Sequence, residues 1–172
     1  RPVTLAGVAP TQAELLGFPF RAIDGAPMVE AIAGNETPPR LIVTMIWDAG
    51  GRNVLGRWKD DWPYLESLIP QGAWYEHATV GTSPTSTAQT HATIGTGAFP
   101  AAHGIVAPRL RIGDELTTPW AKGPAYLVEP TLADLYDRAM GNEPVVGEIG
   151  TVSIHLGMVG HGAMWGGGDQ DI

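Results

Sequence analysis

The chain has 172 residues, which suits a single domain with a buried core. Its formal net charge is -8 at pH 7, so binding along a nucleic-acid phosphate backbone is not expected. It has no cysteine, which excludes disulfides and thiolate metal ligands, and no apolar run approaches the ~20 residues of a membrane-spanning helix.

Residues 1–40 are expected to form an extended N-terminal arm that crosses the surface of the domain. Prolines recur through this segment and hydrophobic periodicity is weak. One short helix is predicted over residues 12–16. The apolar side chains that follow it, among them Phe18 and Phe20, would suit the covering of a sheet edge or face.

An apolar run over residues 41–47 is rich in β-branched side chains and is followed by Asp48 and two glycines. This pattern predicts a buried parallel strand. Asp48 would then lie at the carboxyl end of the strand, which is the edge where open α/β sheets bind ligands. The alternative for Asp48 is an ordinary turn or capping role before Gly50.

Further elements alternate along the chain in the manner of a βαβ sheet. A helix is predicted over 61–69 and a strand over 73–80, with a second helix over 131–140 and a strand over 145–149. We therefore expect an α/β fold with a mostly parallel sheet flanked by helices.

Two local patterns add detail to this expectation. Thr131 and Asp134 have the spacing of a capping box at the start of the second helix. Residues 109–116 alternate polar and apolar side chains around Gly113 and Asp114, which predicts a small hairpin with its turn at that pair.

Residues 84–104 are crowded with hydroxyl groups, two histidines and three glycines, and they carry no charged Asp, Glu, Lys or Arg side chain. Such a stretch predicts a loop that ends in a helix N-terminus, because Ser and Thr are good caps. The start of a helix attracts anions, and a hydroxyl group held there can attack an electrophile such as phosphorus. Ordinary turn and cap chemistry is the alternative.

Together these residues resemble the alkaline phosphatase superfamily, and within it the type I phosphodiesterase/nucleotide pyrophosphatase branch. That branch has a metal-binding Asp after its first strand, a nucleophilic Thr four positions before a His, a Thr-Gly pair and a Pro-x-x-His-Gly-Ile segment. The matching positions here are Asp48, Thr87, His91, Thr96-Gly97 and Pro100 to Ile105. The likeness is strong from about residue 41 to 105.

The resemblance implies a metal-dependent phosphoester hydrolase. Thr87 would be the nucleophile, Asp48 and Thr87 would be metal ligands, and two divalent ions, zinc by family precedent, would complete the site. The substrate would be a small phosphate ester or a nucleotide, and a covalent phosphothreonine or its ester would form. Residues 41–172 would be the N-terminal portion of an alkaline-phosphatase-like α/β domain that is incomplete here.

Two departures from the family pattern affect these expectations. Pro108 stands where the branch has a phosphate-binding Asn, so Arg109, Arg111 or a backbone amide would have to bind the substrate. The further Asp and His ligands of the family would lie beyond Ile172, so this polypeptide alone is expected to be inactive or poor in metal. A C-terminal remainder or a second chain would complete the fold and cover unpaired sheet edges or exposed apolar surface.

Other interpretations remain open at this level. The tail holds His155, His161, Asp169 and Asp171, which are metal-ligand types without a match in the family, and a structural loop is the alternative. The chain could be a non-catalytic relative that keeps the fold as a binding module, as Pro108 would favour. A Ser/His hydrolase using Ser83 or Ser86 with His91 or His103 is disfavoured, because no Gly-x-Ser-x-Gly elbow is present.

Overall fold

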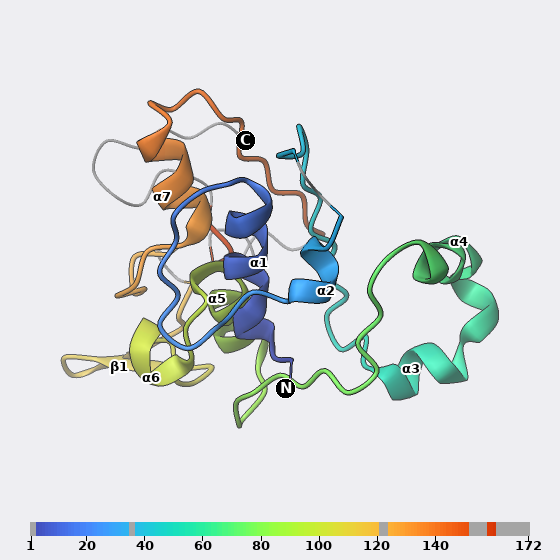
Figure 1. Cartoon of the computed structure of the whole chain (residues 1–172). Coiled ribbons are helices and arrows are strands. Elements are labelled where there is room, and N and C mark those ends of the chain that lie inside the picture. Colours follow the sequence, from blue (N-terminus) through green and yellow to red (C-terminus); the bar gives the residue numbers. More distant parts are fainter. Residues whose placement is uncertain (1–2, 35–36, 121–123, 152–157, 161–172) are drawn as a thin grey trace.

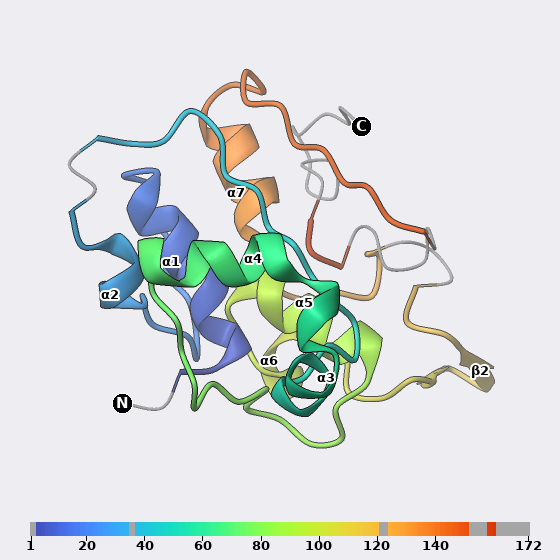
Figure 2. The ribbon, with the colours of Figure 1, turned by 90° about the vertical axis from the view of Figure 1, so that its right-hand side faces the viewer.

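The computed structural model describes residues 3–34, 37–120, 124–151 and 158–160. Helices predominate in these residues, with one small sheet (Figures 1 and 2). In chain order the elements are η1 (Leu5–Gly7), α1 (Val8–Leu15), α2 (Val29–Ile32), α3 (Arg52–Arg57), η2 (Lys59–Asp61), α4 (Pro63–Leu68), η3 (Ile69–Gln71), α5 (Thr87–Thr96), α6 (Pro100–His103), β1 (Leu110–Ile112), β2 (Glu115–Thr117) and α7 (Leu132–Ala139).

Helix α5 is the centre of the packed body. Eight of its ten residues are buried, so it has no solvated face of the kind that a surface helix shows. Its small residues Ala88 and Ala92 pack in one apolar cluster with Ile105 and Met158. The helix ends at Gly97, whose φ of 66° is the left-handed conformation that glycine adopts at a helix C-terminus. The hydroxyl-rich stretch therefore begins a buried helix, as the sequence predicts.

Helix α1 lies beside α5 in the body, and this corrects part of the expected extended arm (Figure 1). Ala9 and Ala13 are one helical turn apart and are almost fully buried, because their small side chains let two helices approach closely. They form a second apolar cluster with Leu132 of α7. The ring of Phe18 meets that of Tyr136 edge-on, with centroids 5.3 Å apart, instead of covering a sheet.

Helix α7 confirms the predicted second helix and its capping box. The Thr131 hydroxyl accepts a hydrogen bond from the Asp134 N–H at 3.1 Å, and Asp134 Oδ2 accepts one from the Thr131 N–H at 3.2 Å. Both residues are buried, so the reciprocal bonds satisfy groups that water cannot reach. The predicted helix near Tyr64 is present as α4, with Pro63 in its first turn.

The mostly parallel sheet is not formed by the described residues, and the three predicted strands are corrected accordingly. Residues 41–47 and 145–149 form no strand, and residues 73–80 make only an isolated parallel bridge, from Thr79 to Thr4. The only sheet among the described residues is the antiparallel pair β1–β2, which confirms the predicted hairpin. A strand needs a neighbour for its N–H and C=O groups, and local sequence does not supply one.

Segment 41–47 exposes its apolar side chains. Leu41, Val43 and Met45 are 76%, 73% and 63% exposed, and they alternate along the segment as strand side chains do. Ile149, in segment 145–149, is fully exposed. These residues leave apolar surface uncovered in the described part of the chain.

Helices α3 and α4 form an arm that stands away from the body (Figure 1), and in Figure 2 the same arm faces the viewer. Between this arm and residues 45–50 lies an apolar hollow of ≈ 460 Å³. Its lining includes Trp47, Trp62 and Trp74 together with Leu65 and Leu68 of α4. The apolar side chains Leu65 and Leu68 of α4 therefore border the hollow. None of the described helices has the length and apolar character needed to cross a membrane.

Candidate active site

Thr87 is the first residue of α5, and Ser86 precedes it in an extended conformation. The first intrahelical bond runs from the Thr90 N–H to the Ser86 carbonyl, at 3.1 Å. The N–H groups of residues 87–89 therefore lie ahead of the helical ladder, at the positive end of the helix dipole. The Ser86 hydroxyl does not cap the helix and has no partner in the described residues. Thr87 is half-buried, whereas Ala88 and Gln89 are almost fully buried, so the Thr87 N–H is the donor of this turn that an anion can reach.

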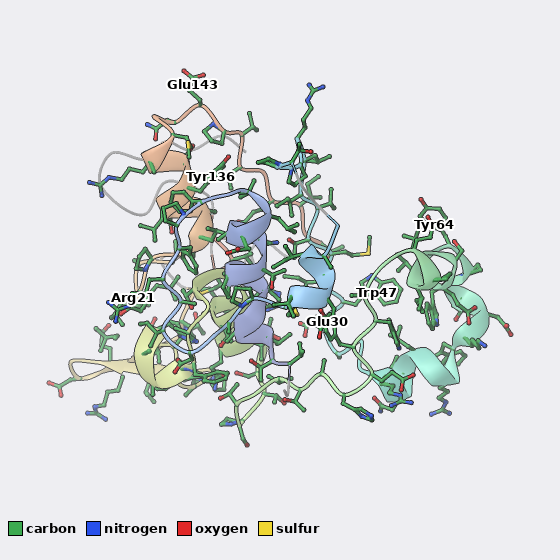
Figure 3. All side chains as sticks on the ribbon, in the orientation of Figure 1. Arg21, Glu30, Trp47, Tyr64, Tyr136 and Glu143 are labelled. Carbon is green, nitrogen blue, oxygen red and sulfur yellow. The ribbon has the colours of Figure 1, made fainter. Side chains whose placement is uncertain are left out.

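Asp48 meets Thr87 at this helix start. The Thr87 hydroxyl donates a hydrogen bond to Asp48 Oδ2 at 3.0 Å. Asp48 lies in a tight turn in which Ala49 has a φ of 58° and the Gly50 N–H donates to the Trp47 carbonyl at 2.9 Å. The turn carries the chain from residues 41–47 toward the α3–α4 arm, where Figure 3 labels Trp47. The two residues that the sequence pairs are thus in contact, although no sheet among the described residues positions Asp48.

The carbonyl of Thr87 is held from within the helix. His91 Nδ1 lies 2.8 Å from the Thr87 oxygen, and because a carbonyl only accepts, Nδ1 carries the proton and donates. The Thr90 hydroxyl donates to the same oxygen at 3.1 Å. His91 is buried, so its ring faces the protein interior, where it holds the backbone of Thr87. The four-residue spacing from Thr to His in the motif has this physical use.

His103 is fully buried and is also committed to structural bonds. Its Nδ1 lies 3.1 Å from the Ile105 N–H and its Nε2 lies 3.1 Å from the Thr93 hydroxyl. Burial lowers the pKa of His103 to about 4, because desolvation disfavours the charged ring more than nearby backbone acceptors and Asp24 favour it. His103 is therefore neutral near pH 7.

The described residues do not assemble a Ser–His pair. His91 bonds the Thr87 carbonyl, His103 bonds Thr93, and neither ring is hydrogen bonded to Ser83 or Ser86. A serine nucleophile needs a base within hydrogen-bond reach. The geometry thus favours Thr87 over either serine as the reactive hydroxyl.

The predicted substrate-binding residue Arg109 is not brought to Thr87 by any contact. Arg109 is exposed just before β1 and makes no hydrogen bond or ion pair with other described residues. Its neighbour Arg111 is engaged on the hairpin, where it pairs with Asp114 at 3.6 Å. Pro108 is exposed as well. Substrate binding by Arg109 remains a prediction.

Glycines of the motif permit a close approach of backbone to α5. A Cβ on Gly95 would lie 2.3 Å from the carbonyl oxygen of Val159, well inside contact distance. Met158 beside it is fully buried against the same helix. The sequence gives no local sign of this close approach, because the partner segment is more than sixty residues away in the chain.

Asp48 and Thr87 offer two adjacent oxygen donors, which is the ligand chemistry that divalent cations accept. This pair fits a metal as two of its ligands. Within the described ranges no group of three or more His, Cys, Asp or Glu side chains is close enough to hold an ion. The tail candidates His155, His161, Asp169 and Asp171 lie outside the described residues.

The carboxylate of Asp48 is hydrogen bonded to the Thr87 hydroxyl at the start of a buried helix, and a helix start favours anions. The family model for type I phosphodiesterase/nucleotide pyrophosphatase matches residues 42–172. The chain belongs to that family, and the resemblance drawn from its motifs is confirmed. No curated protein and no solved structure matches the chain.

Proposed function

We propose that this chain belongs to a metal-dependent phosphoester hydrolase that uses Thr87 as its nucleophile. The observation that carries the proposal is the bond from the Thr87 hydroxyl to Asp48 at the N-terminus of α5. Family membership supports hydrolysis of phosphodiester or pyrophosphate bonds, and thereby a phosphate ester or nucleotide as substrate.

Asp48 and Thr87 would hold one divalent ion between them, and a second ion is expected from the family, with zinc as the expected metal. A bound divalent ion lowers the pKa of a hydroxyl ligand, which otherwise is a poor nucleophile near neutral pH. The remaining ligands would come from outside the described residues. Asp48 contributes negative charge and orients the hydroxyl, since it accepts its hydrogen bond.

The chain's own groups account for binding and orientation of the phosphoryl group. The N–H group of Thr87 lies at the start of α5 and would donate to a phosphoryl oxygen as charge develops on it. Thr87 Oγ1 would release its proton to solvent and form the new bond to phosphorus as the bond to the leaving oxygen breaks, and the leaving oxygen would take a proton from solvent. The phosphothreonine product would then be hydrolysed by water. His91, bonded to the Thr87 carbonyl, holds the backbone of the nucleophile during these steps.

We also propose that residues 41–172 are the N-terminal portion of an alkaline-phosphatase-like α/β domain. The support is the alternating apolar exposure of 41–47 and the hollow beside α4, both of which a flanked sheet would cover. Segments 41–47 and 145–149 would then be strands of a mostly parallel sheet, completed by a C-terminal remainder or a second chain. Residues before 41 would precede that domain.

Metal analysis and a chelator test on the full-length protein examine the proposed function. Purified protein should contain divalent metal and hydrolyse bis(p-nitrophenyl) phosphate or p-nitrophenyl phosphate, and a chelator should remove the activity until zinc is restored. Quenching a turnover reaction in acid should trap phosphate or its ester on a peptide that contains Thr87. A metal-loaded protein without hydrolysis of either ester would instead support a binding module, the alternative that Pro108 favours.

A further inference from the structure

Three buried polar side chains form a hydrogen-bonded network between α5 and α6. The proposed reaction does not use this network. Gln89, Thr93 and His103 are each 0% exposed. They come from two separate segments, because Gln89 and Thr93 lie on α5 and His103 ends α6. Buried polar groups need partners, so such a network links the segments through hydrogen bonds of defined direction.

The direction of each bond follows from the donors available. The Ile105 N–H can only donate, so His103 Nδ1 accepts from it, and His103 Nε2 carries the ring proton. That proton is donated to the Thr93 hydroxyl at 3.1 Å, and the Thr93 hydroxyl donates in turn to the Gln89 carbonyl at 2.9 Å. The neutral imidazole therefore fixes how the Thr93 hydroxyl points along α5.

Gln89 extends the chain of bonds to the first turn of α5. Its Nε2 donates to the Val106 carbonyl at 2.9 Å and lies 3.5 Å from the Pro84 carbonyl, so one amide touches the segments on both sides of the helix. Gln89 is two residues after Thr87. Its Oε1 is buried without a partner in the described residues. An unpaired buried acceptor costs stability, so the stabilising role of this amide lies in the bonds of Nε2, which hold Gln89 in position.

We propose that Gln89, Thr93 and His103 are positioning residues that set the first turn of α5 and thereby aim Thr87 Oγ1 at Asp48. The inference rests on the proposed role of Thr87 as nucleophile. The hydrogen bonds of these three side chains run to Pro84, Gln89, Ile105, Val106 and each other, and not to Asp48 or the Thr87 hydroxyl, so they act through the helix backbone. A small displacement of an attacking atom can lower a rate by about a hundredfold, which is why a buried tether two residues away affects turnover.

Thr93 offers a matched pair of variants for the test. Thr93→Val keeps the shape of the side chain and removes the hydroxyl, whereas Thr93→Ser keeps the hydroxyl and removes a methyl group. Both are compared with the parent full-length protein at a temperature where circular dichroism shows each to be folded. We expect kcat of Thr93→Val to fall at least about tenfold with KM within about twofold, and Thr93→Ser to keep kcat within about threefold.

Hydrogen exchange provides a readout that does not depend on activity. In Thr93→Val the amides of residues 89–91 should exchange at least about tenfold faster than in Thr93→Ser, because the tether to the first turn is lost. Gln89→Met keeps the length of the side chain and removes the amide. It should lower kcat and speed amide exchange in the same way as Thr93→Val. It serves as the second variant if Thr93→Val does not fold.

The outcomes separate this inference from the proposed function. Equal kcat for the valine and serine variants, with only a lower melting temperature for valine, would show that the network is merely structural and overturn the inference. If instead Thr87→Ala retains the activity of the parent, the proposed function fails. In that case the exchange rates still decide whether the network sets the first turn of α5.

Discussion

Thr87 Oγ1 and Asp48 Oδ2 lie 3.0 Å apart although 39 residues separate them in the chain. The contact joins the start of the most buried helix to a tight turn at the base of the α3–α4 arm. The Thr87 hydroxyl therefore lies between the positive end of the α5 dipole and the negative carboxylate of Asp48. Oxygen atoms of this kind, so close together, are what a bridging cation requires.

Replacing the proposed nucleophile should abolish turnover and leave the fold intact. Thr87→Ala should lower kcat by about a thousandfold or more, since the bond to phosphorus cannot form. Its free energy of unfolding should change by less than about 1 kcal/mol, because the hydroxyl is only half-buried. Steady-state kinetics and denaturant unfolding measure the two effects. Thr85→Ala, at an exposed position in the same loop, is the matched control and should keep normal turnover.

Removing the charge of Asp48 should weaken metal binding first. Asp48→Asn keeps the size of the side chain but offers a weaker oxygen ligand, so the dissociation constant for zinc should rise at least about tenfold, with activity recovering partly at high zinc. Titration calorimetry and activity against zinc concentration give both numbers. Asp60→Asn, on the exposed η2 turn, should change neither. Unaltered zinc affinity in Asp48→Asn would remove Asp48 from the ligand set.

A methyl group on Gly95 should destabilise the protein. The added Cβ would lie 2.3 Å from the Val159 oxygen, and the obstacle is backbone, so a segment would have to move. We expect a loss of about 2 kcal/mol or more, as overpacking of a core gives. Gly56→Ala in α3 is the control, because its Cβ would meet nothing within 4 Å and alanine favours the helix by about 1 kcal/mol. Thermal unfolding of both variants should show opposite shifts, and equal shifts would contradict the close approach.

Acid should weaken the fold through His103. Its pKa is about 4 when folded and 6.5 when unfolded, so between these values the unfolded chain binds more protons than the folded one. The contribution of His103 is therefore complete above about pH 6.5 and declines as pH falls toward 4, by at most about 1.4 kcal/mol per pH unit. Urea unfolding between pH 4 and 7 measures the slope. His103→Gln should flatten this part of the profile, and an unchanged slope would show that the ring does not carry it.

Local signals in the sequence predicted several elements correctly. Thr131 and Asp134 predicted the start of α7, and Gly113 and Asp114 predicted the hairpin turn. The hydroxyl-rich stretch predicted the helix that begins at Thr87. Each depends on residues within a few positions of one another, because caps and turns satisfy their hydrogen bonds locally. The motif from Asp48 to His103 likewise indicated the family without any structure.

The tertiary structure decided what depends on distant partners. The apolar pattern of residues 41–47 indicated a strand, yet a strand forms only where another backbone lies alongside, and the described residues provide none. Ala9 and Ala13 fall in the segment that the sequence predicts to be an extended arm, but their small side chains let α1 pack into the core. The sequence by itself determined which residues offer a hydroxyl or a carboxyl group, since these groups are intrinsic to their side chains. Only the fold decided that Thr87 meets Asp48 and that Thr93 meets His103, because those contacts bring together segments that the chain holds apart.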